Sequence, residues 1–164
     1  MPAWPPIIDG DTRHDLSHLD PFTVEVALGG RTASLQVDFG PHVFSNEKGK
    51  GPRLGFLREE RYFCRDRYDT SFEAAHFMRT GFVDGHVRSF LSHRRKQQFY
   101  TLDAGHVVLF MTLQKAVDAD DLVKCRVVSA YAPTWSRNGL PRRRLYAVRT
   151  VLKRRLDGTP IPVR

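Results

Sequence analysis

The alternation of apolar and polar positions is most regular between residues 22 and 39. Two stretches, 22–28 and 32–39, place an apolar side chain at every second position, which is the period of a strand with one face in the core. Gly29-Gly30 lies between them and is typical of a two-residue hairpin turn. If Leu28 faces Arg31, the apolar pairs across the turn are Val26 with Ala33, Val24 with Leu35 and Phe22 with Val37. The sequence predicts a β-hairpin with one face on the core.

Later stretches have the same strand character. We expect a short strand near residues 61–64 and longer ones at 98–102, 107–113 and 122–131. In the last of these, Lys124 and Arg126 alternate with Val123 and Cys125. The two cations should therefore project from the face opposite the core.

Two segments have a helical period. The first spans about residues 70–80, with Asp69 or Thr70 as its cap and Gly81 after its end. Its expected inward side chains are Phe72, Ala75 and Met78 or Phe77. The second opens near Pro141, and its apolar residues recur every three or four positions at Leu145, Val148, Leu152 and Leu156. The predicted fold is α+β in a single domain. It has a mostly antiparallel sheet of hairpins with about five or six strands, one mid-chain helix and a basic amphipathic C-terminal helix.

Composition sets the domain limits. The chain has 164 residues, 41% of them hydrophobic, which is enough for one core. Residues 1–20 are acidic and proline-rich and are expected to be a poorly packed leader; residues 21–157 form the domain and 158–164 a tail. No apolar stretch approaches the ~20 residues that span a bilayer, and no secretory signal opens the chain. A cytoplasmic protein without a membrane partner is expected.

Positive charge is concentrated toward the C-terminus. Residues 1–50 hold four Lys or Arg against seven Asp or Glu, so the net charge of +8 comes entirely from the rest of the chain. Residues 137–164 hold nine basic side chains against Asp157 alone. Such a density attracts a polyanion such as nucleic acid, although a merely solvated arginine face is the alternative. The predicted phosphate contacts are Arg142, Arg143, Arg144, Arg149, Lys153, Arg154 and Arg155.

No motif indicates a metal or cofactor. Cys64 and Cys125 are the only cysteines and are expected to be buried thiols. Neither a CxxC pair nor a CxxH pair is present, so zinc is not expected. Gly49-Lys50-Gly51 lacks the hydroxyl residue and the following helix of a phosphate loop. The composition of segment 45–55 favours a mobile surface loop. Whether His42, Cys64 and Cys125 converge is left open by the sequence.

The chemistry that remains is metal-free cleavage of RNA. It needs a base near the 2′-hydroxyl, an acid near the leaving oxygen and cations around the phosphate. The candidate residues at strand ends and loops are His42, Arg67, Tyr68, Ser129 and Tyr131. In the structural alternative, Arg67 pairs with Asp66 or Asp69, and Tyr68 is a half-buried anchor.

Several short motifs resemble those of a known family. FGPHVF around His42, the FCxxRY segment around Cys64 and the SAY strand at residues 129–131 resemble a loose family of small bacterial proteins linked to mobile elements. That resemblance spans roughly residues 21–150 and implies no particular activity. A basic domain with a helix and an antiparallel meander is also distantly similar to the barnase, colicin and RelE-like endoribonucleases, from which the early hairpin and the final helix depart.

Three functions stay open at this stage. The first is a nucleic-acid-binding or accessory protein that contacts backbone phosphate, with RNA favoured over DNA. The second is a metal-independent endoribonuclease of the toxin type. The third is an interaction module that binds an acidic protein, such as an antitoxin or a host factor. The oligomeric state is not indicated.

Overall fold

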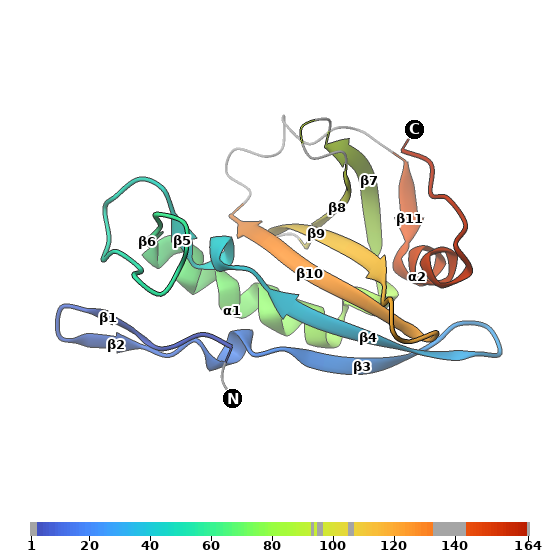
Figure 1. Ribbon diagram of the computed structural model, residues 1–164, viewed down its shortest axis with the longest axis horizontal. Coiled ribbons are helices and arrows are strands. Elements are labelled where there is room, and N and C mark those ends of the chain that lie inside the picture. The colour runs from blue at the N-terminus through green and yellow to red at the C-terminus, as the bar shows by residue number, and fades with distance from the viewer. Residues whose placement is uncertain (1–2, 93, 95–96, 105–106, 133–143, 164) are drawn as a thin grey trace.

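A seven-stranded mixed sheet forms the centre of the computed structural model, which describes residues 3–92, 94, 97–104, 107–132 and 144–163 (Figure 1). The strand order is β11-β7-β8-β9-β10-β4-β3. The strands are β3 (Phe22–Ala27), β4 (Thr32–Phe39), β7 (His86–Ser92), β8 (Gln97–Asp103), β9 (Val108–Lys115), β10 (Leu122–Tyr131) and β11 (Leu145–Ala147).

The hairpin of β3 and β4 has the predicted register. Phe22 faces Val37, Val24 faces Leu35 and Val26 faces Ala33. Strands at the expected positions 98–102, 107–113 and 122–131 are also present as β8, β9 and β10. Local alternation and turn chemistry were sufficient to place these elements.

The expected sheet of about five or six mostly antiparallel strands is wrong. The sheet has seven strands and is mixed, because β10 pairs with β4 in parallel, with Val123 opposite Leu35 and Val127 opposite Phe39. A parallel pair needs a long crossover, and here the chain from residue 40 to 121 supplies it. Alternation within a strand shows its buried face but not its neighbour, so the sequence pattern could not reveal this pairing. Strand β7 was also missed.

The first helix, α1 (Arg65–Thr80), begins earlier than its expected start near residue 70. Cys64 precedes it, and Asp69 lies within the helix, where it pairs with Arg65 at 3.0 Å. Ala75 and Met78 are buried as expected, and the helix ends before Gly81. Phe72, which was expected to face inward, is 45% exposed.

The second helix, α2 (Val148–Asp157), is shorter than the periodicity suggested. Leu145 belongs to β11, which pairs with β7, while Val148, Leu152 and Leu156 are buried. Its end is fixed by Gly158, whose φ of 69° is the left-handed conformation that favours glycine. The expected start at Pro141 lies outside the described residues.

The N-terminal segment packs on the domain, in contrast to the loose leader that its composition suggested. It forms β1 (Ile7–Asp9), β2 (Thr12–His14) and the short helix η1 (Ser17–Leu19). Ile7, Leu16 and Leu19 are buried in the core although acidic residues surround them in sequence. A few well-placed apolar side chains thus dock a segment of polar average composition.

Three short elements and a loop lie at one end of α1. They are η2 (Pro41–Val43), β5 (Ser45–Asn46) and β6 (Tyr62–Phe63), with β5 and β6 paired; η3 (Phe82–Asp84) lies at the other end of the helix. Segment 45–55 therefore begins in a strand rather than being wholly a loop.

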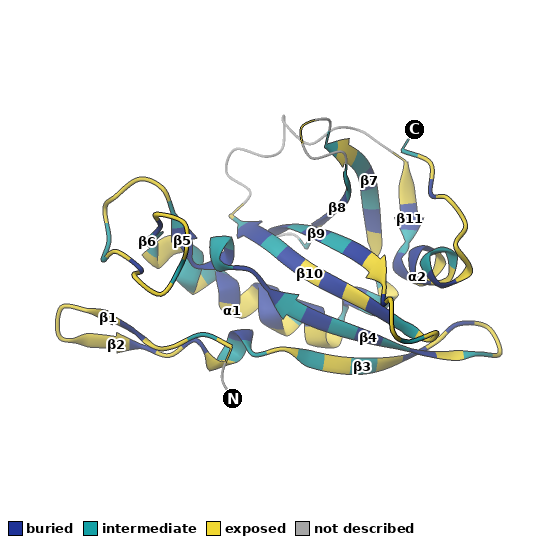
Figure 2. Ribbon diagram, viewed as in Figure 1, coloured by how far each residue is buried: buried dark blue, intermediate teal, exposed yellow. Residues whose placement is uncertain are grey.

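The two faces of the large sheet have different surroundings. Side chains of α1 and α2 belong to one buried cluster with Tyr100, Met111 and Val127. Along β4 and β10, buried residues alternate with more exposed ones (Figure 2). Because successive side chains of a strand project to opposite sides, the more exposed ones belong to the other face. No helix among the described residues is long and apolar enough to cross a membrane.

Candidate functional site

The open face is the face of the large sheet that α1 and α2 do not cover. Lys124 lies between Gln36 and Gln114 on the neighbouring strands, and Arg126 lies between Asp38 and Thr112. Because facing residues project to the same side of a sheet, these polar side chains form one surface. Lys124 and Arg126 are exposed, as their alternation with buried Val123 and Cys125 predicted.

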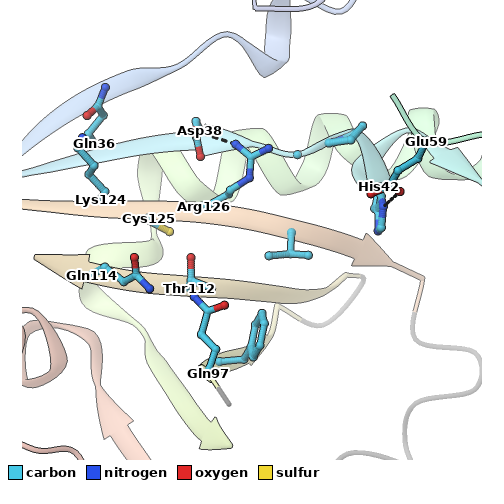
Figure 3. A pocket seen from close by; sticks show the side chains of 14 residues that line it. Gln36, Asp38, His42, Glu59, Gln97, Thr112, Gln114, Lys124, Cys125 and Arg126 are labelled. Atoms are coloured by element: carbon cyan, nitrogen blue, oxygen red, sulfur yellow. Dashed lines mark hydrogen bonds and ion pairs between the residues drawn. The ribbon is translucent and has the colours of Figure 1, made fainter. Parts of the chain in front are cut away.

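A polar cleft of about 610 Å³ lies on this face (Figure 3). Its polar lining comprises Gln36, Asp38, His42, Glu59, Gln97, Thr112, Gln114, Lys124 and Arg126. In the part of the chain that the structure describes, the side chains of Gln36, Gln97, Thr112 and Gln114 make no hydrogen bond. Three amides and a hydroxyl with unused donors and acceptors are well suited to a polar ligand.

Two ion pairs border the cleft. Arg126 Nη1 donates to Asp38 Oδ2 at 3.0 Å, and His42 Nε2 lies 3.1 Å from Glu59 Oε2. The side chain of His42 is 25% exposed and that of Glu59 is 65% exposed. Both pairs are accessible to solvent, so a bound ligand could compete for them.

A row of four aromatic rings continues the open face beside the cleft. The ring centroids are 5.6 Å apart for Phe99 and Phe90, 6.1 Å for Phe90 and Phe110, and 5.8 Å for Phe110 and Tyr131. These four rings, the aromatic row, border a hollow of about 270 Å³. The hollow shares Phe99 and Val128 with the polar cleft, so the two are adjacent.

Three of the predicted catalytic residues are neighbours. Arg67 Nη1 donates to the backbone oxygens of His42 at 2.9 Å and of Ser45 at 2.8 Å. Its guanidinium carbon lies 4.4 Å from the ring centroid of Tyr131, which is a cation–π contact. Arg67 therefore ties η2 and β5 to the end of β10, a supporting role that sequence spacing did not indicate.

Arg61 was not singled out in the sequence, although it is one of the few buried charged residues. Its side chain is 4% exposed and donates to Ser45 Oγ at 3.0 Å and to Ser45 O at 2.8 Å. Burial lowers the pKa of Arg61 from its usual value, while Glu47 opposes this shift. Arg61 therefore stabilises the first residue of β5, Ser45, through two hydrogen bonds. An isolated arginine at a strand end carries no sequence signal for such a role.

Tyr68 and Ser129 differ in their relation to the site. Tyr68 lies in another cluster, where its hydroxyl donates to Asp15 O at 3.1 Å and its ring packs against His14 and His18. Burial raises its pKa. It is the half-buried anchor that the alternative interpretation described. Ser129 is buried, and it lines the hollow beside the aromatic row.

The C-terminal cations are mostly engaged in contacts within the fold. Arg149 donates to Ala27 O and to Asp84, at 2.7 and 2.9 Å. Arg155 donates to Gln98 Oε1 at 2.8 Å and to the Tyr100 hydroxyl at 2.7 Å. Arg144 and Arg154 lie near the Tyr146 ring, and Lys153 is exposed; Arg142 and Arg143 lie outside the described residues.

The cysteines and acidic residues form no metal site in the described ranges. Both cysteines are free thiols, and burial raises the pKa of Cys125. Cys125 is buried as expected, whereas Cys64 is only half-buried. No group of three His, Cys, Asp or Glu side chains gathers there with the geometry to hold a metal ion.

Comparison with protein families gives one result. The model of the YjaZ family matches residues 6–156, which is most of the chain. The chain belongs to the YjaZ family. This YjaZ match covers the whole region, residues 21–150, over which the motifs resembled a family of small bacterial proteins. The link to mobile elements and the distant likeness to endoribonucleases remain predictions. Neither the curated proteins nor the solved structures give a match.

Proposed function

We propose that this YjaZ-family protein binds single-stranded nucleic acid on the open face, with RNA preferred to DNA. The observation that carries the proposal is the adjacency of the aromatic row to a polar cleft whose amides have no partner in the described structure. Aromatic rings on a sheet stack with bases regardless of their identity, and polar side chains beside them bind base edges and sugars.

The dimensions of the open face suit a short strand of nucleic acid. From β4 to β7 the face crosses five neighbouring strands. At about 4.8 Å per step this is a track of about 19 Å. RNA-recognition modules of similar width stack two or three bases on a four-stranded sheet. A segment of that length could therefore place bases on the aromatic row and its backbone over the cleft.

Electrostatics favour the same ligand. The chain carries a net charge of +8. Lys124 and Arg126 are exposed on the open face, and Arg94 is exposed at the turn between β7 and β8. Cations at these positions can contact phosphate, so binding should weaken steeply as salt rises. The unpartnered amides supply hydrogen-bond partners for a 2′-hydroxyl, which is the reason to favour RNA.

The test compares matched variants on and off the open face. Fluorescence anisotropy would measure the affinity of the full chain for labelled single-stranded RNA, single-stranded DNA and duplex DNA at two salt concentrations. We expect Phe110→Ala to weaken RNA binding about 5- to 150-fold, the equivalent of one lost base stack. Phe56→Ala is the control, because Phe56 is 43% exposed but lies on the loop between β5 and β6.

Two lysine variants distinguish RNA binding on the open face from RNA binding by α2, the helix that the charge distribution indicated. Lys124 on β10 and Lys153 on α2 are both exposed. Lys124→Ala should weaken RNA binding and reduce its salt dependence, whereas Lys153→Ala should change neither. A larger loss in Lys153→Ala would assign binding to α2. Preference for duplex DNA, or no binding to any of the three probes, would overturn the proposal.

A further inference from the structure

The pair of His42 and Glu59 has the arrangement of a general base and its orienting group. A carboxylate only accepts hydrogen bonds, so His42 Nε2–H donates to Glu59 Oε2 at 3.1 Å. In the neutral ring, this hydrogen bond leaves the lone pair on Nδ1. A base whose second nitrogen is held by a carboxylate is the arrangement that activates a hydroxyl nucleophile.

A cation lines the same cleft as this pair. A Cβ placed on Gly40 would lie 3.6 Å from Arg126 Nη2, so the guanidinium lies against the backbone two residues before His42. Figure 3 shows Arg126 and His42 on the wall of one cleft, with their partners Asp38 and Glu59. An arginine on the wall of this cleft can stabilise charge that develops on a phosphate bound in the cleft.

The segment that carries His42 is held firmly. Arg67 donates to the backbone oxygen of His42 at 2.9 Å, and Ser45 Oγ donates to Pro41 O at 2.6 Å. The N–H of Gly40 donates to Val127 O at 2.9 Å, which joins the start of η2 to β10. A base held on both sides in this way keeps its orientation toward the cleft.

We propose that the protein cleaves the single-stranded RNA that it binds, without a metal ion, with His42 as the general base. This inference rests on the proposed function. His42 takes the proton of a 2′-hydroxyl, the 2′-oxygen forms a bond to the adjacent phosphorus, and the bond from phosphorus to the 5′-oxygen breaks. The leaving 5′-oxygen takes a proton from water in the open cleft, and the hydroxide that remains is neutralised by the proton from His42. The products are a 2′,3′-cyclic phosphate and a 5′-hydroxyl.

The roles of the neighbours follow from their contacts. Glu59 orients the base, Arg126 stabilises the non-bridging phosphate oxygens, and Arg67 positions the segment of His42 without touching the RNA. General-base catalysis contributes about 10²- to 10⁴-fold to rate. We therefore expect His42→Ala to slow cleavage by at least about 100-fold, and Glu59→Gln to slow it less because the base itself remains.

The experiment measures cleavage and binding separately on the full chain. A single-stranded RNA with a fluorophore and a quencher reports cleavage in EDTA, and the same sequence with 2′-O-methyl groups reports binding, since it has no nucleophile. His76→Ala, an exposed histidine on α1, is the matched control and should cleave like the wild type. Glu59→Gln keeps the test valid if His42→Ala fails to fold, which thermal melting would reveal.

Each outcome decides the inference. Cleavage by the wild type and by His76→Ala, lost in His42→Ala while 2′-O-methyl RNA still binds, supports it. Binding of 2′-O-methyl RNA without cleavage of the RNA overturns the inference and leaves the proposed function intact. Equal cleavage by the wild type and both His42→Ala and Glu59→Gln also overturns it, because the activity is then a contaminant. Failure to bind either RNA overturns both.

Discussion

The two faces of the large sheet use the same strands for different purposes. On the covered face, Tyr100, Met111 and Val127 are buried beneath α1 and α2. On the open face, Phe110, Thr112 and other side chains from the same strands border the aromatic hollow and the polar cleft. The side chains of the covered face pack against the helices. The open face carries amide and hydroxyl side chains that make no hydrogen bond within the described residues.

The arginines of the two faces differ in the same way: those on the covered side make contacts within the fold, and Arg126 on the open face is exposed. Arg155 on the covered side bonds Gln98 and the Tyr100 hydroxyl, and its Nε is buried without a partner in the described residues. Arg126 on the open face is exposed and pairs with Asp38 on the neighbouring strand β4. A basic residue count therefore does not locate a binding surface, because the fold itself can engage the cations that dominate the count.

The largest effect is expected from the covered face. Leu152 on α2 is 1% exposed, so Leu152→Ala should lower the free energy of unfolding by about 2–5 kcal/mol through lost burial and a cavity. Thr112→Ala, on the open face of the large sheet, should lower the free energy of unfolding far less. Urea denaturation of both variants is the measurement. Equal losses would show that the two faces do not differ in their contribution to stability.

A matched arginine pair gives the next largest effect. Arg155→Met should lower the free energy of unfolding by about 1–3 kcal/mol, because the buried Tyr100 hydroxyl loses its partner, and should leave RNA affinity unchanged. Arg126→Met should cost at most about 1 kcal/mol of stability but weaken RNA binding, since its ion pair is exposed. Denaturation and anisotropy measure the two quantities. The reverse assignment of the losses would refute the distinction between the faces.

The smallest effect concerns the N-terminal segment, which packs on α1 through His18. Its ring stacks on Phe72 with centroids 3.7 Å apart, and its Nε2 lies 2.6 Å from Ser71 Oγ. Burial lowers the pKa of His18 from 6.5 to about 4. As pH falls, the unfolded chain takes up this proton first, so stability should fall between about pH 6.5 and 4.

The corresponding measurement is urea denaturation of the wild type and His18→Gln at pH 7 and pH 4.5. After allowance for solvent screening, we expect the wild type to lose on the order of 1 kcal/mol more than the variant over this interval. Because protonation would act at the N-terminal segment, RNA binding at pH 7 should be the same in both proteins. Parallel loss of stability in the two proteins would contradict the role of His18.

Much of the local structure was evident from the chain. The hairpin of β3 and β4, the span of β10 and the end of α1 all followed from alternation and turn chemistry. The cations of the open face were also foreseen, since Lys124 and Arg126 alternate with buried residues. The candidate site itself was foreseen only in part, because His42, Arg67 and Tyr131 were named while Glu59, Arg61 and the aromatic row were not.

The sequence by itself determined which residues of each strand share a face, because that depends only on the two-residue period of the backbone. Only the tertiary structure decided which strands are neighbours, and so placed Asp38 beside Arg126, aligned four aromatic rings from four strands and brought Glu59 to His42. It also decided that Arg149 and Arg155 support the fold. Such pairings depend on long-range packing, to which neither periodicity nor charge counting is sensitive.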